Sequence, residues 1–371
     1  MKSREKKTFT ISTRREEPPS LERRKLLTGG VGLGVAQKIG WTRALGFGVL
    51  PHVSMAGNAQ IPVAIALPQV PGFGHLPLQL TKALDVYQSL GLAVQWQPVV
   101  SDRQAAQQLA NGTVQAAAMD FSQVLQLRAQ GVPAVAIAVE SRCPQLVLGL
   151  HPPAKTDARS LALKGKRVGM LAHGGAHMLT FRAMQVAGLN SADLLLQTFA
   201  KADEVLDGYR AVTLDGFCLD SAQVVGLEQR GDVRVLADTR TLRGTADLYG
   251  GPVPGSVLAV LTHTIRQNAA LCMLLAKGVV QSLKWLQTAG PTDLVRKLPE
   301  ALVGYDPSLF LAGFEKAREG FSVDGVLSAE AAAAGLVALL RLDAKALSLQ
   351  NRLAEVYQNQ FAEAARKPSR A

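Results

Sequence analysis

The sequence predicts an α/β fold of two similar lobes, each a mostly parallel sheet flanked by helices. From Pro62 onward, short apolar runs alternate with stretches of helical periodicity, which is typical of parallel sheets covered on both faces. Residues 215–237 also align without gaps on residues 115–137, with six identities in 23 positions that follow the same order of strand and helix. At 371 residues the chain is long enough for two such units.

The first half supplies the elements of one lobe. Strands are expected at residues 63–67, 94–100, 116–119 and 134–139, where apolar residues run together or alternate. Residues 77–90 carry apolar side chains at helical spacing and stop at Gly91, a common helix end. Ser101 is placed to cap a second helix, which Gly112 ends.

The second half repeats this order. Strands are expected at residues 166–171 and 195–199, and helices at residues 176–187 and 202–209. In both copies of the repeat an apolar strand runs into an aspartate, Asp120 or Asp220, with a glutamine three residues later. Asp-x-x-Gln is a capping-box pattern, in which the aspartate accepts from the helix and the glutamine reaches back. The same aspartates would lie at the carboxyl edges of strands, where ligands bind, so both roles are open.

The first 59 residues are predicted to be an export signal. They carry +7 of the net charge of +11. Arg23-Arg24-Lys25-Leu26-Leu27 precedes a glycine-rich apolar run, and small residues up to Ala59 offer cleavage sites. The pattern resembles a bacterial twin-arginine signal, although Lys38 and Arg43 interrupt its apolar region. A basic arm without a targeting role is the alternative.

Composition argues against several classes of protein. The rest of the chain has a net charge of only +4 and no basic stripe interleaved with aromatic residues, which argues against nucleic-acid binding. No apolar stretch of 18 residues is free of charge, which argues against a membrane-spanning helix. Cys143, Cys218 and Cys272 form no CxxC pattern, and His173 and His177 have no third type of ligand nearby. No metal or cofactor is therefore expected.

Residues 171–179, LAHGGAHML, form a polar, glycine-rich turn between a predicted strand and a predicted helix. Backbone N–H groups at the start of a helix can receive an anion or an oxygen-rich ligand. A tight connection with no ligand is the alternative.

Four segments carry a resemblance to a known class of proteins. They are VAIALPQVPGFGHLPL, LANGTVQAAAMDFSQVLQLRAQGVPAVAIA, LALKGKRVGM with the Gly-Gly turn after it, and VRVLAD. In this order and spacing, between residues 61 and 340, the chain resembles the type II periplasmic substrate-binding proteins of the nitrate, sulfonate and taurine ABC transporter class. That class is related to the thiamine-pyrimidine binding proteins.

The resemblance implies a division of the chain and a hinge. Two crossover strands, near residues 145–151 and 255–262, would join the lobes and allow closure around a ligand. The expected parts are an export signal (1–59), the first part of lobe 1 (61–148), lobe 2 (149–256), a mainly helical return segment of lobe 1 (257–345), and a C-terminal helix with a basic tail (346–371).

The resemblance also implies which residues face the ligand. The candidates are Phe73, His75, Asp120, Ser122, Arg142, His173, Gly174, Gly175, Ala176 and Asp220. Phe73 would be an apolar wall, His75 a polar tip, and Arg142 a partner for a carboxylate or sulfonate. A core contact for Phe73 and a solvent-facing Arg142 are the alternatives. Because two aspartates disfavour a purely anionic ligand, a zwitterion or a neutral heterocycle with donors fits better than nitrate.

The function implied is that of an exported, periplasmic and monomeric solute-binding protein. It would capture a small polar organic molecule, sulfonate- or taurine-like or related, and deliver it to the membrane permease of an ABC importer, without a nucleic-acid partner. The alternatives are an enzyme or a thiamine-precursor-type binding protein on the same scaffold. A sensor domain that contacts another protein through its helical residues 329–365 is a further alternative.

Overall fold

The computed structural model describes residues 60–69, 72–152, 163–171, 174–220, 222–304 and 306–366. Contacts divide the chain into residues 1–55 and residues 56–371, and the described residues all belong to the second unit. The predicted export signal, His173 and residues 367–371 of the basic tail lie outside the described residues.

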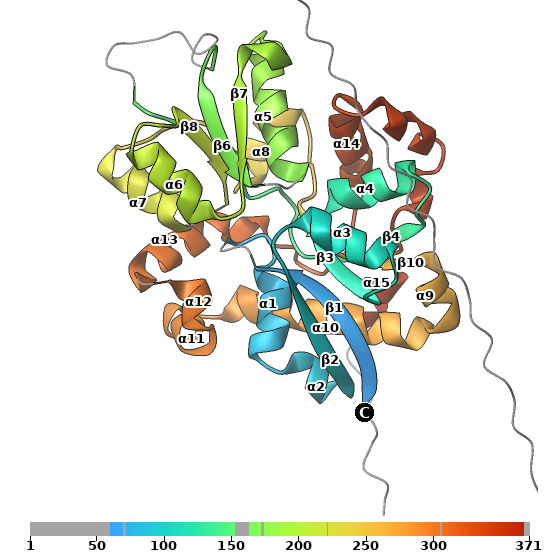
Figure 1. The fold of residues 1–371 in the computed structure, drawn as a ribbon. Coiled ribbons are helices and arrows are strands. Elements are labelled where there is room, and N and C mark those ends of the chain that lie inside the picture. The colour runs from blue at the N-terminus through green and yellow to red at the C-terminus, as the bar shows by residue number, and fades with distance from the viewer. Residues whose placement is uncertain are drawn as a thin grey trace, which may run out of the picture. The chain divides into compact units, whose positions relative to one another are not determined.

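Within these residues the strands form two five-stranded sheets of matching topology (Figure 1). The first sheet has the order β2 (Leu92–Val99), β1 (Ile61–Pro68), β3 (Ala116–Asp120), β10 (Ser256–Leu261), β4 (Ala134–Val139). The second has the order β7 (Leu195–Phe199), β6 (Arg167–Leu171), β8 (Gly216–Leu219), β5 (Val147–Leu150), β9 (Arg234–Asp238). The fourth strand of each order is antiparallel to its neighbours. The predicted fold class of two α/β lobes is confirmed.

The two antiparallel strands show how the chain joins the lobes. After β4 the chain leaves the first sheet and enters the second as β5, and after β9 and α8 (Leu242–Tyr249) it returns as β10. Each sheet therefore contains one strand supplied by a crossing of the chain. We call the first sheet with its helices the first lobe and the second sheet with its helices the second lobe.

Helices cover both faces of each sheet because the central strands bury side chains on both sides, whereas the edge strands β2 and β7 leave most of theirs partly or fully exposed. On one face of the first sheet, the core contains residues of α1 (Leu76–Ala83), α10 (Ala269–Thr288), α13 (Pro307–Ala317) and α15 (Gln360–Arg366). On the other face it contains residues of α3 (Asp102–Ala110), α4 (Phe121–Ala129) and α14 (Ala329–Leu340). The second sheet packs α5 (Gly174–Val186) and α8 on one face, and α6 (Ala202–Arg210) and α7 (Ala222–Arg230) on the other.

The remaining helices are short. They are α2 (Val86–Ser89), α9 (Thr262–Gln267), α11 (Pro291–Lys297) and α12 (Glu300–Val303), with 3-10 turns η1 (Ser191–Asp193), η2 (Arg318–Gly320), η3 (Ala344–Leu349) and η4 (Leu353–Glu355). Helix α10 is long and apolar enough to cross a bilayer, but more than half of its apolar window is buried inside the protein. That burial is typical of a core helix.

Two predicted helices are broken in the structure. The helix expected at residues 77–90 is divided into α1 and α2 because Asp85 adopts a left-handed conformation, with φ of 49°. The helical C-terminal region is likewise divided into α14, the 3-10 turns η3 and η4, and α15. Apolar periodicity correctly predicted that both regions are helical, but it does not indicate a single left-handed residue or a 3-10 turn within them.

Candidate functional site

Asp220, at the end of β8, reaches across to the first lobe. Its Oδ2 accepts hydrogen bonds from the backbone N–H groups of Phe73 and Gly74, both at 2.8 Å. A Cβ at Gly72 would lie 2.5 Å from that Oδ2 and 2.7 Å from the carbonyl oxygen of Asp220. Only glycine fits at position 72 while the two lobes touch in this way.

Asp120, the equivalent residue of the repeat, reaches in the opposite direction. Its Oδ1 accepts from the backbone N–H of Ser122 at 2.8 Å and so caps α4. Its Oδ2 faces Gly175 of the second lobe, where a Cβ would lie only 2.6 Å away. Each lobe thus places an aspartate against the glycine-containing turn of the other, and we call this pair of contacts the interlobe site.

A buried histidine supports the site from the first lobe. Nε2 of His75 lies 3.1 Å from Oδ1 of Asp102, and Nδ1 lies 3.3 Å from Oε1 of Glu140. Oε2 of Glu140 accepts the backbone N–H of Leu78, and Oδ2 of Asp102 accepts that of Asp120. With two carboxylates as partners, both ring nitrogens act as donors, and the imidazolium fixes the turn before α1.

Burial and neighbouring charge shift the pKa of each group at the site. Burial would lower the pKa of His75, but the carboxylates of Asp102 and Glu140 outweigh it and raise this pKa well above its usual value. Burial, with repulsion from Asp102, raises the pKa of Asp120 to about 7. Burial also raises the pKa of Asp220 to about 6, opposed by the amides of Phe73 and Gly74. The closed arrangement therefore disfavours two ionised aspartates.

The structure brings some of the predicted site residues to the interlobe site. His75, Asp120, Ser122, Gly175 and Asp220 lie at it through the contacts above. Gly174 begins α5 beside Gly175, and the next residue, Ala176, is buried with its carbonyl 3.7 Å from Sγ of Cys218. Each of the two turns is contacted by the aspartate of the opposite lobe.

Two predicted ligand contacts are corrected. The ring of Phe73 is 2% exposed and packs on Phe310, with ring centroids 5.5 Å apart, so it is a core side chain. The guanidinium of Arg142 donates to the carbonyls of Glu319, at 2.6 Å, and Phe321, at 3.1 Å. Arg142 therefore ties the first crossing to the return segment and is not available at the aspartates.

The predicted capping box is half formed at Asp120, whereas the contacts of the Asp220 carboxyl in the described residues are to Phe73 and Gly74 of the other lobe. Gln123 donates to Gln126 at 2.9 Å and Gln223 donates to Asp203 at 2.8 Å, so neither side chain reaches back to its aspartate. The N–H of Asp120 instead finds Asp102. Gln123 is held within α4 itself, and Gln223 is held by Asp203 of the neighbouring helix α6.

Sequence reasoning missed Asp102 and Glu140. Glu140 follows directly on the apolar strand β4 and is fully buried, and Asp102 opens α3 at 6% exposure. A carboxylate at the carboxyl end of a buried strand was a usable signal for Glu140. The pairing of both residues with His75 depends on neighbours 27 and 65 residues away in sequence.

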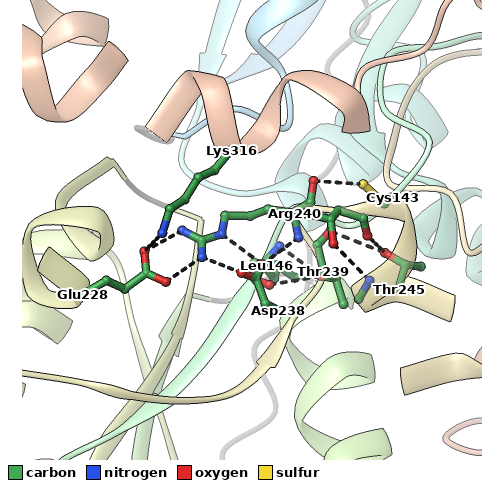
Figure 2. A network of polar contacts seen from close by, with 10 residues as sticks. Cys143, Leu146, Glu228, Asp238, Thr239, Arg240, Thr245 and Lys316 are labelled. Carbon is green, nitrogen blue, oxygen red and sulfur yellow. Dashed lines mark hydrogen bonds and ion pairs between the residues drawn. The ribbon is translucent and has the colours of Figure 1, made fainter. Parts of the chain in front are cut away.

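Polar contacts join the start of β5, next to the first crossing, to the segment after β9, and Figure 2 shows them. The backbone N–H of Leu146 donates to Oγ1 of Thr239 at 3.1 Å. Arg240 forms a two-pronged pair with Glu228, at 2.7 and 3.1 Å, and also binds Asp238. Lys316 of α13 lies 2.7 Å from Glu228 of α7. Arg240, Glu228 and Lys316 therefore connect the segment after β9 and helix α7 of the second lobe with α13 of the return segment.

A surface cavity of the first lobe lies away from the interlobe site. A cavity of about 470 Å³, lined by residues such as Lys82, Tyr87 and Trp96, lies at the amino-terminal ends of β1 and β2. That is the opposite end of the first sheet from Asp120. We assign the interlobe site from the contacts between the lobes.

Comparisons with known proteins agree with this architecture. Residues 73–236 match the family model described as NMT1/THI5 like. A protein of known structure from Bordetella bronchiseptica RB50 shares 25% identity, with a TM-score of 0.76 over 83% of this chain and 97% of that chain. The periplasmic aliphatic sulphonate binding protein SsuA from Escherichia coli shares 17%, with a TM-score of 0.61 over 79% and 88%. The alkanesulfonate-binding protein SsuA from Xanthomonas axonopodis pv. citri shares 17%, with a TM-score of 0.58 over 83% and 97%.

The chain therefore has the periplasmic binding protein fold and contains an NMT1/THI5-like domain, which confirms the resemblance drawn from the sequence. The desulfurization enzyme DSZB also shares the fold, at 15% identity and a TM-score of 0.55. The fold alone does not decide between binding and catalysis. The sequence matches none of the curated proteins with which it was compared.

Proposed function

We propose that this protein is an exported, monomeric receptor that captures a small polar organic molecule, sulfonate- or taurine-like or related, for an ABC importer. The lobes would open at the interlobe site, admit the solute and close on it. The match to the NMT1/THI5-like family and the likeness to sulfonate-binding proteins support this proposal.

One observation carries the proposal. Two aspartates in equivalent positions of a duplicated chain each contact a glycine-containing turn of the opposite lobe. Such reciprocal contacts break when two lobes part and re-form when they close. They place backbone amides and carboxylates at the same junction, which is the set of groups needed to orient a polar solute.

Binding without chemistry is part of the proposal. Burial raises the pKa of the Cys218 thiol to about 12, and those of Cys143 and Cys272 to about 12 and 11. Since a thiolate is the reactive form, these cysteines are poor nucleophiles at neutral pH. Product analysis after incubation with each ligand would test this point, and turnover of any of them would favour the enzyme alternative.

Isothermal titration of the full chain tests the receptor function. The titrants are alkanesulfonates, taurine, nitrate, amino acids and pyrimidines. We expect binding of at least one at micromolar affinity, which corresponds to about 8 kcal/mol. Absence of binding heat and of thermal stabilisation with all of these titrants would contradict the proposal.

Export is tested separately. A chain with Arg23→Lys and Arg24→Lys should remain in the cytoplasm, while the parent reaches the periplasm, because twin-arginine transport reads this pair. Equal export of both chains, measured by cell fractionation, would remove this part of the proposal.

A further inference from the structure

The interlobe site has an excess of negative charge. Its ionisable groups are Asp102, Asp120, Glu140, Asp220 and His75. The one cation among them, His75, is shared between Asp102 and Glu140. Arg240 exerts a longer-range attraction on Asp220, but its guanidinium binds Glu228 and Asp238. In the described part of the chain, neither Asp120 nor Asp220 forms an ion pair.

Oxygen atoms at the site lack hydrogen-bond donors. Oδ1 of Asp220 is buried without a partner. The hydroxyl of Ser122, a residue only 2% exposed, adjoins the carboxyl of Asp120 and lowers its pKa, but it lies outside good hydrogen-bond geometry. Oδ2 of Asp120 receives no hydrogen bond from the residues that the structure describes, although Asp120 is 6% exposed. Buried acceptors without donors are costly, and a ligand that donates to them would recover that cost.

The two aspartates lie around one turn of the first lobe. Asp220 binds the amides of Phe73 and Gly74, and Ser256 donates to the carbonyl of Gly74. Ser256 is also the partner of Asp120 across strands β10 and β3. Ser256 therefore links the turn that Asp220 binds to the strand end that carries Asp120.

A sulfonate without a donor group fits these contacts poorly. The amide pair at Phe73 and Gly74 is already filled by Asp220. An anion that took this pair would stand against the Asp220 carboxylate when the lobes closed, and like charges at such range disfavour each other. A cationic donor is attracted where an anion is repelled, because it pairs with the carboxylates and leaves the amides of Phe73 and Gly74 bound to Asp220.

We propose that the ligand carries an ammonium or amidinium group, which donates to Asp120 and Asp220 and lies between them when the lobes close. This inference rests on the receptor function proposed above and names the charge of its ligand. Among sulfonate-like solutes it selects amino-sulfonates over simple alkanesulfonates. The hydroxyl of Ser122 supplies a further contact for the same group.

Matched probes test the proposal by isothermal titration of the full chain at pH 8. One set is propane-1-sulfonate, 3-aminopropane-1-sulfonate and propane-1,3-diamine, and the second is benzenesulfonate, benzylamine and benzamidine. We expect binding only from probes that carry an ammonium or amidinium. Tighter binding of a sulfonate without an amine would overturn the assignment of charge and leave the receptor function standing. No binding by any of the six would count against the receptor function itself.

Two variants test the residues. In Asp220→Asn the side-chain oxygen can still accept from the amides of Phe73 and Gly74, but an NH2 donor replaces Oδ1 and the negative charge is lost. Asp120→Asn keeps a good helix cap. Each should weaken the amine-containing probes about ten- to a hundredfold, as expected for loss of a charge-assisted hydrogen bond. Asp247→Asn, on the exposed part of α8, is the control and should leave affinity unchanged. Unchanged affinity in both site variants would refute the proposal.

Discussion

Raising the pH should open the unliganded interlobe site through Asp120. Burial and the Asp102 carboxylate raise the pKa of Asp120 from 3.8 to about 7 in the closed arrangement. A carboxyl whose pKa is raised on closure holds a proton there and releases it on opening. Its contribution to closure is therefore full at low pH and is lost as the pH rises through about 7.

The magnitude follows from the size of the shift. Each pKa unit is worth about 1.36 kcal/mol, so going from pH 5 to pH 8 costs the closed state at most about 3 kcal/mol, the value reached when the whole shift arises on closure. Asp102 belongs to the first lobe and repels Asp120 in the open state as well, so the ratio of open to closed molecules should rise by no more than roughly a hundredfold. The groups that act on Asp120 are Asp102, His75, Ser122 and Tyr249. The raised pKa of Asp220 acts in the same direction, so a variant is needed to isolate Asp120, whereas both carboxylate partners of His75 lie in the first lobe with it.

The assay is a distance between spin labels on the two lobes, measured without ligand. Val100→Cys and Val186→Cys provide exposed labelling positions, 67% and 61% exposed, while the native cysteines are buried. The parent distance should lengthen between pH 5 and pH 8. Asp120→Asn should remove much of this response, and Asp247→Asn should not. An identical pH response in the parent and in Asp120→Asn would show that Asp120 does not control opening.

Three further predictions concern the packing around the site. Gly72→Ala should weaken ligand binding by tenfold or more with little loss of stability, because the added Cβ would meet Asp220 only when the lobes are closed. Gly251→Ala is the control, since the nearest atom to its added Cβ is 3.9 Å away. Equal affinities of the two variants by titration would contradict this role of Gly72. His75→Ala should lower the free energy of unfolding by about 3–5 kcal/mol in urea, since it leaves the fully buried Glu140 without its cation; a loss below about 1 kcal/mol would count against that role. Arg240→Leu should lower the free energy of unfolding by about 3 kcal/mol, because the Arg240 side chain is only 5% exposed. Lys316→Met should lower it by less than about 1 kcal/mol, because the Lys316 side chain is 45% exposed. The reverse order would show that burial does not set these losses of stability.

Much of the fold could be predicted from local pattern. The alternation of apolar runs with helical periodicity marked the strands of both sheets, and the repeat placed Asp120 and Asp220 at equivalent strand ends. The cap at Asp120 also follows from its position before α4. These features depend on residues within a few positions of each other, so the sequence reports them directly.

The site depended on contacts that local pattern does not contain. Arg142 looked free to bind an anion, but its partners are carbonyl groups near residue 320. Phe73 looked like a wall of the site, but α13 covers its ring. In both cases the return segment of the first lobe, which comes last in the chain, decided the role of a residue that comes early.

Periodicity and repetition along the chain were enough to predict the two α/β lobes and the pair of aspartates at matching strand ends. The contact of each aspartate with the turn of the other lobe, and the sharing of His75 by Asp102 and Glu140, depend on the three-dimensional fold. Asp220 and Phe73 are 147 residues apart, and their hydrogen bond exists only because two chain crossings bring separate sheets edge to edge. A hydrogen bond forms over about 3 Å of space, whatever the separation in sequence.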